Sequence, residues 1–246
     1  MTLGRINKLE TFGSVDGPGV RFVVFTQGCP MRCLFCHNPE TWDFKGDKDG
    51  AFDISAEDLL KKALRYQSYW GRDGGITVSG GEPLMQMDFL IEFFELAKAA
   101  GVNTCIDTSG VNFVRSEPYF GKFQRLMKST DLLLVDLKII DPEEHKKLTG
   151  HGIEHNLDMF RYLDEIEKPI WIRHVLVPGI SDNDEYLHRA RDFIDTLHNV
   201  QKVEVLPYHS LATAKYQQMG IDYALKETKS PTPERIANAR AILSID

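Results

Sequence analysis

Short apolar runs recur along this chain of 246 residues, each followed by a polar or glycine-containing turn and then by a segment with helical periodicity. The runs are rich in β-branched residues and predict strands at 21–26, 75–79, 103–107, 132–136, 169–177 and 202–207. Their almost continuous apolar character is typical of parallel strands that are covered on both faces. Strands and helices that alternate at intervals of about 30 residues predict right-handed βαβ units.

Several of the intervening helices have clear end signals. Residues 87–100 carry an apolar stripe that stops at Gly101, a natural helix terminator. Ser55 and Ser181 each precede an aspartate by three residues, which resembles a capping box, and we expect a helix to start at each. A last helix is expected from Thr232, because the proline that follows is tolerated in the first helical position.

Six such units fit either an open doubly wound sheet or an incomplete barrel. Polar or glycine residues follow the expected carboxyl end of each strand: the cysteine loop 29–36, then 80–83, 107–110, 136–138, Arg173 with 177–179, and 207–209. An open sheet offers mainly one crevice, whereas residues from six strand ends converge in a barrel. We therefore predict an α/β fold, an incomplete TIM-like (β/α)6 barrel of parallel strands, with the active site at their C-terminal ends. One domain is expected over residues 1–246.

Composition limits the classes of function. The chain is 42% hydrophobic and 26% charged, which is ordinary for a globular protein and excludes a disordered, collagen-like or coiled-coil chain. No apolar run approaches the roughly 18 residues of a membrane span, and the N-terminus lacks a signal-peptide stretch, so we expect a cytoplasmic protein without a membrane partner. The formal net charge of −7 provides no global basic field, so no nucleic-acid partner is expected. We expect a monomer.

The cysteines Cys29, Cys33 and Cys36 have the spacing C-x3-C-x2-C, and Cys105 stands alone. This spacing is not a disulfide framework, and three close thiols indicate a soft metal centre. Thiolates on one loop can bind three irons of a four-iron cluster and leave the fourth iron open. The alternative is structural zinc with His37 as fourth ligand, although closed zinc sites usually draw ligands from two separated pairs. Cys105 lies in an apolar strand, where a free cysteine is commonly a small buried hydrophobe, and it is assigned no catalytic role.

The cysteine loop, with Phe35 just before its last cysteine, resembles the signature of the radical S-adenosylmethionine superfamily, and Gly80-Gly81-Glu82-Pro83 resembles its second motif. The chain is more closely similar to the activating enzymes of glycyl radical enzymes. This similarity runs from about Gly4 to the last helix and includes the segments 16–21, 27–29, 36–38, 136–138 and 206–209.

The resemblance implies a 4Fe-4S cluster bound by the catalytic residues Cys29, Cys33 and Cys36, with S-adenosylmethionine chelating the open iron. One-electron cleavage would produce a 5′-deoxyadenosyl radical that abstracts hydrogen from a glycine Cα of a partner enzyme under anaerobic conditions. Pyruvate formate-lyase is the first choice of partner, because no second cysteine cluster follows Cys36. Flavodoxin or ferredoxin is the implied electron donor. The alternatives are an activator of a related formate-lyase-like enzyme and, outside enzymes, a zinc-loop interaction protein.

The resemblance also assigns S-adenosylmethionine contacts to residues on several strand ends: Phe35, His37, Asn38, Gly80, Gly81, Asp136, Lys138, Arg173 and His209. The Gly80 and Gly81 carbonyls suit the amino group, Lys138 and Arg173 the carboxylate, and Asp136 a ribose hydroxyl. The residue types alone favour structural roles. The glycines predict a tight turn, Asp136 and Lys138 predict an ion pair at the edge of the core, and His209 is expected to be a hydrogen-bonded structural histidine.

Two further sites have equal structural alternatives. Asp107, Thr108 and Asp136, with the carbonyl of Val135, resemble a monovalent-cation site of the family, and the alternative is strand capping and turn hydrogen bonding. By resemblance, Asp16 hydrogen-bonds the partner's glycine loop. Otherwise the turn that it begins only shapes the entry of the chain into the first predicted strand.

Overall fold

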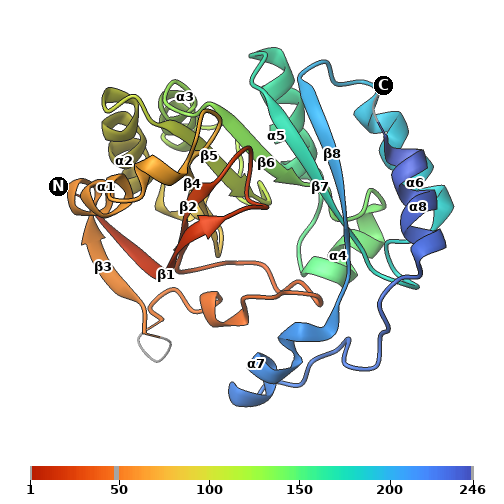
Figure 1. Cartoon of the computed structure of the whole chain (residues 1–246). Helices are drawn as coiled ribbons and strands as arrows, with labels where there is room; N and C mark the ends of the chain where they lie inside the picture. The colour runs from red at the N-terminus through yellow and green to blue at the C-terminus, as the bar shows by residue number, and fades with distance from the viewer. Residues whose placement is uncertain (1, 47–49, 245–246) are drawn as a thin grey trace. The chain divides into compact units, whose positions relative to one another are not determined.

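The computed structural model describes residues 2–46 and 50–244, which form two compact units (Figure 1). The first unit comprises Met1–Pro30 and Thr41–Leu134, and the second comprises Met31–Glu40 and Val135–Asp246. Within the described residues the strand order is β3-β1-β2-β4-β5-β6-β7-β8, and β6 (Leu132–Asp136) runs through the boundary of the two units. The expected α/β class with a mostly parallel sheet is confirmed. A single domain over residues 1–246 stays a prediction.

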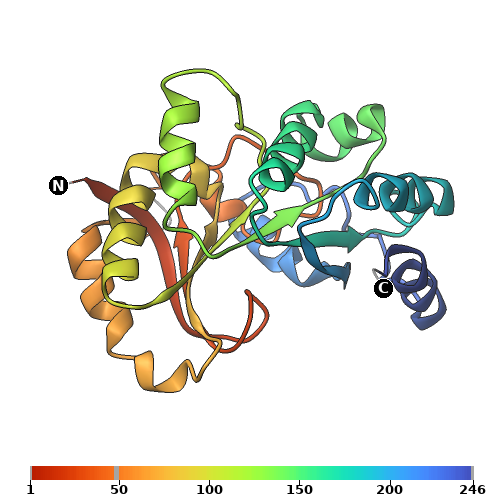
Figure 2. The same cartoon turned by 90° about the horizontal axis from the view of Figure 1, so that it is seen from above.

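The first unit holds most of the sheet and three helices. Its strands are β1 (Leu3–Gly13), β2 (Arg21–Thr26), β3 (Phe52–Ser55), β4 (Gly75–Gly80) and β5 (Asn103–Thr108). Its helices are α1 (Ala56–Leu64), α2 (Met87–Ala99) and α3 (Tyr119–Met127), with single turns η2 (Gln67–Tyr69) and η3 (Pro83–Gln86). The three helices lie side by side, with α2 in contact with both α1 and α3 (Figures 1 and 2). The phenylalanines of α2 are buried.

The central strands of this unit are parallel, as predicted. Arg21 pairs with Gly75 and Thr26 with Gly80, while Gly75 in turn pairs with Asn103, so the carboxyl ends of β2, β4 and β5 lie at one edge. Two strands were not predicted: β1 pairs antiparallel with β2, and β3 pairs antiparallel with β1. Charged residues interrupt the apolar alternation of β1, which therefore lacks the continuous apolar run of the other strands.

Three predicted helix ends are confirmed. Ser55 Oγ accepts from the Asp58 amide at 3.1 Å and caps α1, Thr232 caps α8 (Pro233–Leu243), and Gly101 follows α2 with φ of 71°. The prediction that a helix starts at Ser181 was wrong. The cap of α6 (Asp184–Ile194) is Asn183, whose Oδ1 accepts from the Glu185 amide at 2.8 Å.

Ser181 is instead part of the preceding turn. Its hydroxyl accepts from the Val177 amide at 2.8 Å and donates to the Val175 carbonyl at 2.6 Å. The side chain is fully buried. The hydroxyl is thus directed at backbone groups of the preceding turn, whereas Asn183 stands directly before the first helical residue, where its side chain can accept from the first amides of the helix.

The second unit contains β7 (Ile170–Leu176) and β8 (Val200–Pro207), which are parallel and paired from Ile170↔Val200 to Leu176↔Pro207. Its helices are α4 (Pro142–Thr149), α5 (Glu154–Glu165), α6, α7 (Thr213–Gln218) and α8, and its single turns include η4 (Ser210–Ala212), with η1 (Pro39–Thr41) at the boundary. Helix α8 packs against α6 and β8 (Figure 1). No helix in the described part of the chain is long and apolar enough to cross a membrane.

Candidate active site

In the first unit, the glycines of the second motif lie against the segment that leads into the cysteine loop. The Gly81 amide donates to the Thr26 carbonyl at 2.9 Å, and Gly80 has φ of 109°. A Cβ on Gly80 would lie 2.3 Å from the Thr26 nitrogen, and a Cβ on Gly81 would lie 2.2 Å from the Gly28 oxygen. Only glycine therefore permits this approach of the β4 end to the residues just before Cys29.

Glu82, the next residue, is a buried carboxylate with four donors. Its Oε1 accepts from the Leu84 amide at 3.1 Å and from Thr108 Oγ1 at 2.5 Å. Its Oε2 accepts from the Ser109 amide at 2.9 Å and from Ser109 Oγ at 2.6 Å. Burial raises the pKa of Glu82, although the four hydrogen bonds favour the ionised form. Glu82 thus ties the Gly80-Gly81 turn to the end of β5, a role that its motif position alone did not indicate.

The predicted oxygen donors Asp107 and Thr108 lie at this same edge. Asp107 Oδ2 accepts from Ser79 Oγ at 2.8 Å, and Thr108, besides its bond to Glu82, accepts from the Gly110 amide at 3.0 Å. The strand-capping interactions of the structural alternative are therefore present. The other two predicted cation ligands, Val135 and Asp136, belong to the second unit.

The turn that begins at Asp16 is held from inside the first unit by Arg21, whose side chain is fully buried. The guanidinium donates to Thr77 Oγ1 at 3.0 Å, to Asn103 Oδ1 at 2.7 Å and to the Ile76 carbonyl at 2.6 Å. Thr77 Oγ1 in turn donates to the Asp16 carbonyl at 2.6 Å. Burial lowers the pKa of Arg21, so the acceptors around it must replace the water that the cation has lost.

In the second unit, the cysteine loop pairs with the end of α4. The Arg32 amide donates to the Thr149 carbonyl and the Leu34 amide to the Leu148 carbonyl, each at 2.9 Å. The last carbonyls of a helix have no partner within the helix, so the loop satisfies groups that α4 leaves open. The Cys36 amide donates to the Cys33 carbonyl at 3.0 Å, which closes a turn between the two cysteines.

Cys33 and Lys138 share a buried environment with Phe35. Lys138 is 8% exposed, its Nζ lies 2.8 Å from Asp136 Oδ2, and it lies 5.2 Å from the centroid of the Phe35 ring. Burial raises the pKa of Cys33 to about 11, and the Lys138 ammonium opposes this rise. The ion pair of the structural alternative is thus present, in a place where a cation also favours thiolate chemistry.

His37, Asn38 and His209 are also brought together. The His37 Nε2 lies 3.2 Å from the His209 carbonyl, and the two rings are 4.2 Å apart. Burial, followed by the charge of His209, lowers the pKa of His37. Lys215 Nζ donates to the His37 carbonyl at 2.8 Å and to Asn38 Oδ1 at 3.2 Å. Nothing in the sequence pattern singled out Lys215.

Arg173 does not lie at a strand end, so that part of the prediction was wrong. The ladder of β7 with β8 continues to Leu176, which places Arg173 in mid-strand opposite Glu204. Its Nε lies 3.5 Å from Glu204 Oε2, and both side chains are mostly buried. The arginine therefore already has a carboxylate partner.

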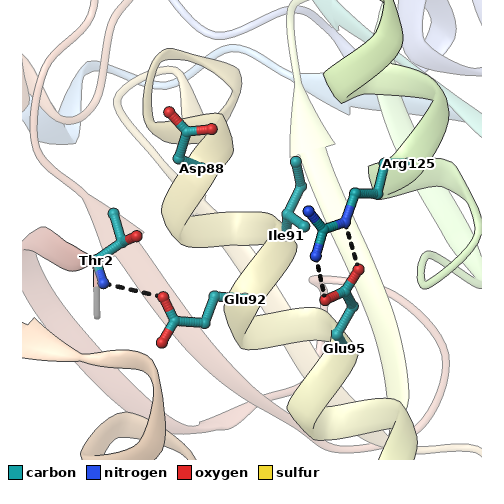
Figure 3. Close-up of a pocket in the computed structure, with 6 residues that line it drawn as sticks. All are labelled: Thr2, Asp88, Ile91, Glu92, Glu95 and Arg125. Atoms are coloured by element: carbon teal, nitrogen blue, oxygen red, sulfur yellow. Dashed lines mark hydrogen bonds and ion pairs between the residues drawn. The ribbon is translucent and has the colours of Figure 1, made fainter.

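The rest of the described chain shows no second candidate site among the predicted residues. None of the four cysteines forms a disulfide, and no group of three or more His, Cys, Asp or Glu side chains that could hold a metal ion is found within residues 2–46 and 50–244. Figure 3 shows a surface pocket of the first unit that contains none of the predicted site residues. It is lined by Thr2, Asp88, Ile91, Glu92, Glu95 and Arg125.

Comparison with known proteins defines the family. The profile of the Radical SAM superfamily matches residues 23–190. The pyruvate formate-lyase-activating enzyme of Streptococcus mutans is 51% identical over 240 residues, which cover 98% of this chain and 90% of that protein. The enzyme of the same name from Staphylococcus epidermidis is 46% identical, over 97% of this chain and 94% of that protein. The chain belongs to the Radical SAM superfamily and, within it, to the pyruvate formate-lyase-activating enzymes.

Solved structures agree in fold. A domain of pyruvate-formate lyase-activating enzyme from Bacteroides vulgatus has a TM-score of 0.57 at 24% identity, covering 69% of this chain and 92% of that chain. SuiB of Streptococcus suis has a TM-score of 0.66 at 16% identity, covering 96% of this chain and 47% of that chain. With the superfamily match, these likenesses confirm the incomplete-barrel fold. Membership in the family implies a 4Fe-4S cluster and S-adenosylmethionine.

Proposed function

We propose that this chain activates pyruvate formate-lyase by forming a glycyl radical on it. The observation that carries the proposal is 51% identity, over 98% of the chain, to a relative of that activity. Pyruvate formate-lyase is the protein substrate, flavodoxin or ferredoxin is the electron donor, and the activator works as a cytoplasmic monomer.

The residues present fit the implied cofactors. Three cysteines that form no disulfide lie in the loop 29–36, and the two that belong to the second unit, Cys33 and Cys36, are joined by a backbone turn. Cys33 is buried and its pKa is raised, so its thiolate needs the positive charge that a metal centre provides. When bound, the cluster would supply the electron for reductive cleavage of S-adenosylmethionine, and the cofactor would supply the 5′-deoxyadenosyl radical needed to remove a hydrogen atom from a glycine Cα of the partner.

The chain's own residues bind and orient the cofactor. Cys29, Cys33 and Cys36 hold the cluster. Lys138 binds the S-adenosylmethionine carboxylate. This role is supported by the burial of Lys138 beside Phe35, where the described contacts include no other cation. The turn at Gly80 and Gly81 receives the amino group of S-adenosylmethionine. This role is supported by the close packing of the turn, which leaves no room for a Cβ at either residue. The remaining contacts come from His37, Asn38, Asp136, Arg173 and His209.

Arg173 would have to exchange Glu204 for the ligand carboxylate, so its role is the least direct of these. The proposed monovalent cation takes oxygen from Asp107, Thr108 and Asp136 and from the Val135 carbonyl. Asp16, whose main chain is anchored through Thr77, receives an amide of the partner's glycine loop. A preset turn suits this task because less order has to be gained on binding.

The function is tested by anaerobic incubation of the reconstituted protein with S-adenosylmethionine, reduced flavodoxin and pyruvate formate-lyase. Electron paramagnetic resonance should then show a glycyl radical on the partner, and methionine and 5′-deoxyadenosine should accumulate with it. A protein that takes up zinc but no iron and sulfide, and that yields no radical, would contradict the proposal.

A further inference from the structure

Lys215, on the short helix α7, makes a compact set of contacts with the residues that follow the cysteine motif. Its Nζ donates to the His37 carbonyl at 2.8 Å, to Asn38 Oδ1 at 3.2 Å and to Glu40 Oε1 at 2.5 Å. An ammonium has three N–H groups, and each is directed to a different oxygen. The three acceptors are a main-chain carbonyl, a side-chain amide and a carboxylate from a segment of four residues.

These contacts fix the direction of the chain as it leaves Cys36. The His37 carbonyl is held directly, and Asn38 and Glu40 are held through their side chains, so the backbone between them has little freedom to rotate. On the other side of the loop, the Arg32 and Leu34 amides bind the end of α4. The segment that carries Cys33 and Cys36 is therefore anchored before and after the two thiols.

The lysine differs from an ordinary surface cation. Its side chain is 41% exposed and that of Glu40 is 21% exposed, so an isolated pair of this kind would add little stability. Lys215, however, is not part of an isolated pair, because its Nζ contacts three oxygens of the segment that follows Cys36. The next residue of α7, Tyr216, is only 3% exposed, so the helix is held in place beside Lys215.

We propose that Lys215 is a positioning residue, whose ammonium holds the loop after Cys36 in the geometry that retains the cluster. The inference rests on the proposed cluster site and adds to it a residue about 180 positions away in sequence. Partners that orient metal ligands typically change metal affinity by about ten- to a hundredfold when they are removed. A change of this size is expected in cluster retention rather than in the stability of the fold.

The test compares Lys215→Met with Lys226→Met. Lys226 is a matched control, because it is an exposed lysine of the same region that pairs only with Asp222 in the contacts described, at 2.9 Å. Reconstituted proteins are mixed anaerobically with an iron chelator, and loss of the cluster absorbance is followed in time. We expect Lys215→Met to lose iron about tenfold faster than the wild type. Lys226→Met should lose iron at the wild-type rate, and both variants should have the melting temperature of the wild type.

A second measurement does not need the cluster. Amide hydrogen exchange of the metal-free protein should be faster over residues 36–41 in Lys215→Met and unchanged elsewhere. Lys215→Arg keeps the charge but not the three converging donors, so we expect an intermediate rate of iron loss. Wild-type iron retention and exchange in Lys215→Met would overturn the inference. If the wild type itself takes up no cluster, the proposed function fails, and the exchange result still decides whether Lys215 orders the loop.

Discussion

The turn 16–19 before β2 and the loop 31–40 after it are held in opposite ways. The turn belongs to the first unit and is fixed from within by Arg21, a fully buried cation whose described partners are neutral oxygens. The loop belongs to the second unit and is fixed from its flanks, by the open carbonyls of α4 and by the partly exposed Lys215.

The difference predicts how each region responds to mutation. Removing a buried cation leaves several buried acceptors without a donor, and the cost falls on the whole unit. Removing a partly exposed anchor costs little stability, because water replaces the lost contact, and the effect is confined to the loop. A turn of the first kind suits a docking surface that must keep its shape. A loop of the second kind suits a site that has to admit a cofactor.

The largest contrast is expected between cysteines of the two regions. Cys105 lies near the turn, since a Cβ on Gly17 would be 3.6 Å from its Sγ, whereas Cys33 and Cys36 lie in the loop. Cys29→Ser, Cys33→Ser and Cys36→Ser should each abolish cluster assembly, because each removes one of three thiolate ligands. Cys105→Ser should leave iron and sulfide content near the wild type. If Cys105→Ser lost as much iron as the other three variants, the assignment of the cluster to Cys29, Cys33 and Cys36 would be contradicted.

The next effect is on folding. Arg21→Leu should lower the free energy of unfolding by at least about 3 kcal/mol, because Asn103 and several carbonyls lose their donor in a buried place. Urea unfolding of the metal-free protein measures it. Arg125→Leu is the control, since Arg125 pairs with Glu95 at the surface (Figure 3) and its loss should change little. A stable Arg21 variant would mean that the turn does not depend on this cation.

Within the second unit, Lys138→Ala should keep the cluster and weaken S-adenosylmethionine binding by at least about thirtyfold, as expected when one member of a buried charge pair is removed. His209→Ala should act in the same direction with a smaller effect. Cluster spectra and cofactor titrations of the same samples separate the two properties. Loss of the cluster in both variants would assign these residues to folding of the loop.

The effect expected at the turn is confined to the partner. Asp16→Ala removes a charge-assisted hydrogen bond to the partner, worth about 1.5–3 kcal/mol, so radical formation should fall by about ten- to a hundredfold at subsaturating partner. Cluster content and S-adenosylmethionine affinity should not change. Radical yield is measured against partner concentration. Full activation by the variant would show that the turn only guides the chain into β2.

Local patterns predicted most of the fold. Strands β2, β4, β5 and β6 were found because both of their faces are largely buried, which leaves an almost continuous apolar run in the sequence. Strands β7 and β8 are less completely buried and were found from their β-branched residues. Strand β1 was missed because the exposed residues Lys8 and Glu10 and the half-buried Arg5 interrupt its apolar pattern. Asn183 and Ser181 both have side chains that can cap a helix. The Ser181 hydroxyl bonds to backbone groups of its own turn, four and six residues earlier, and Asn183 caps α6.

The motifs named candidate site residues, and their cofactor roles stay predictions. Within the second unit, His37 and His209 lie in contact although they are 172 positions apart. Arg21, Glu82 and Lys215 form the supporting contacts, and no spacing rule reveals such pairings, because they depend on how distant segments pack. Arg173 was assigned to a strand end although the strand predicted at 169–177 already contains it, and β7 likewise has it in mid-strand opposite Glu204.

The unpredicted strand β1 has a consequence for where the first cysteine sits. With six parallel strands alone, β2 would be an edge of the sheet, but here it is paired with β1 on one side and with β4 on the other. Sliding β2 by one residue would turn every side chain to the opposite face and would require both ladders to break at once. The chain position of Cys29, three residues beyond β2, is thereby locked against register error during folding, before any iron is bound.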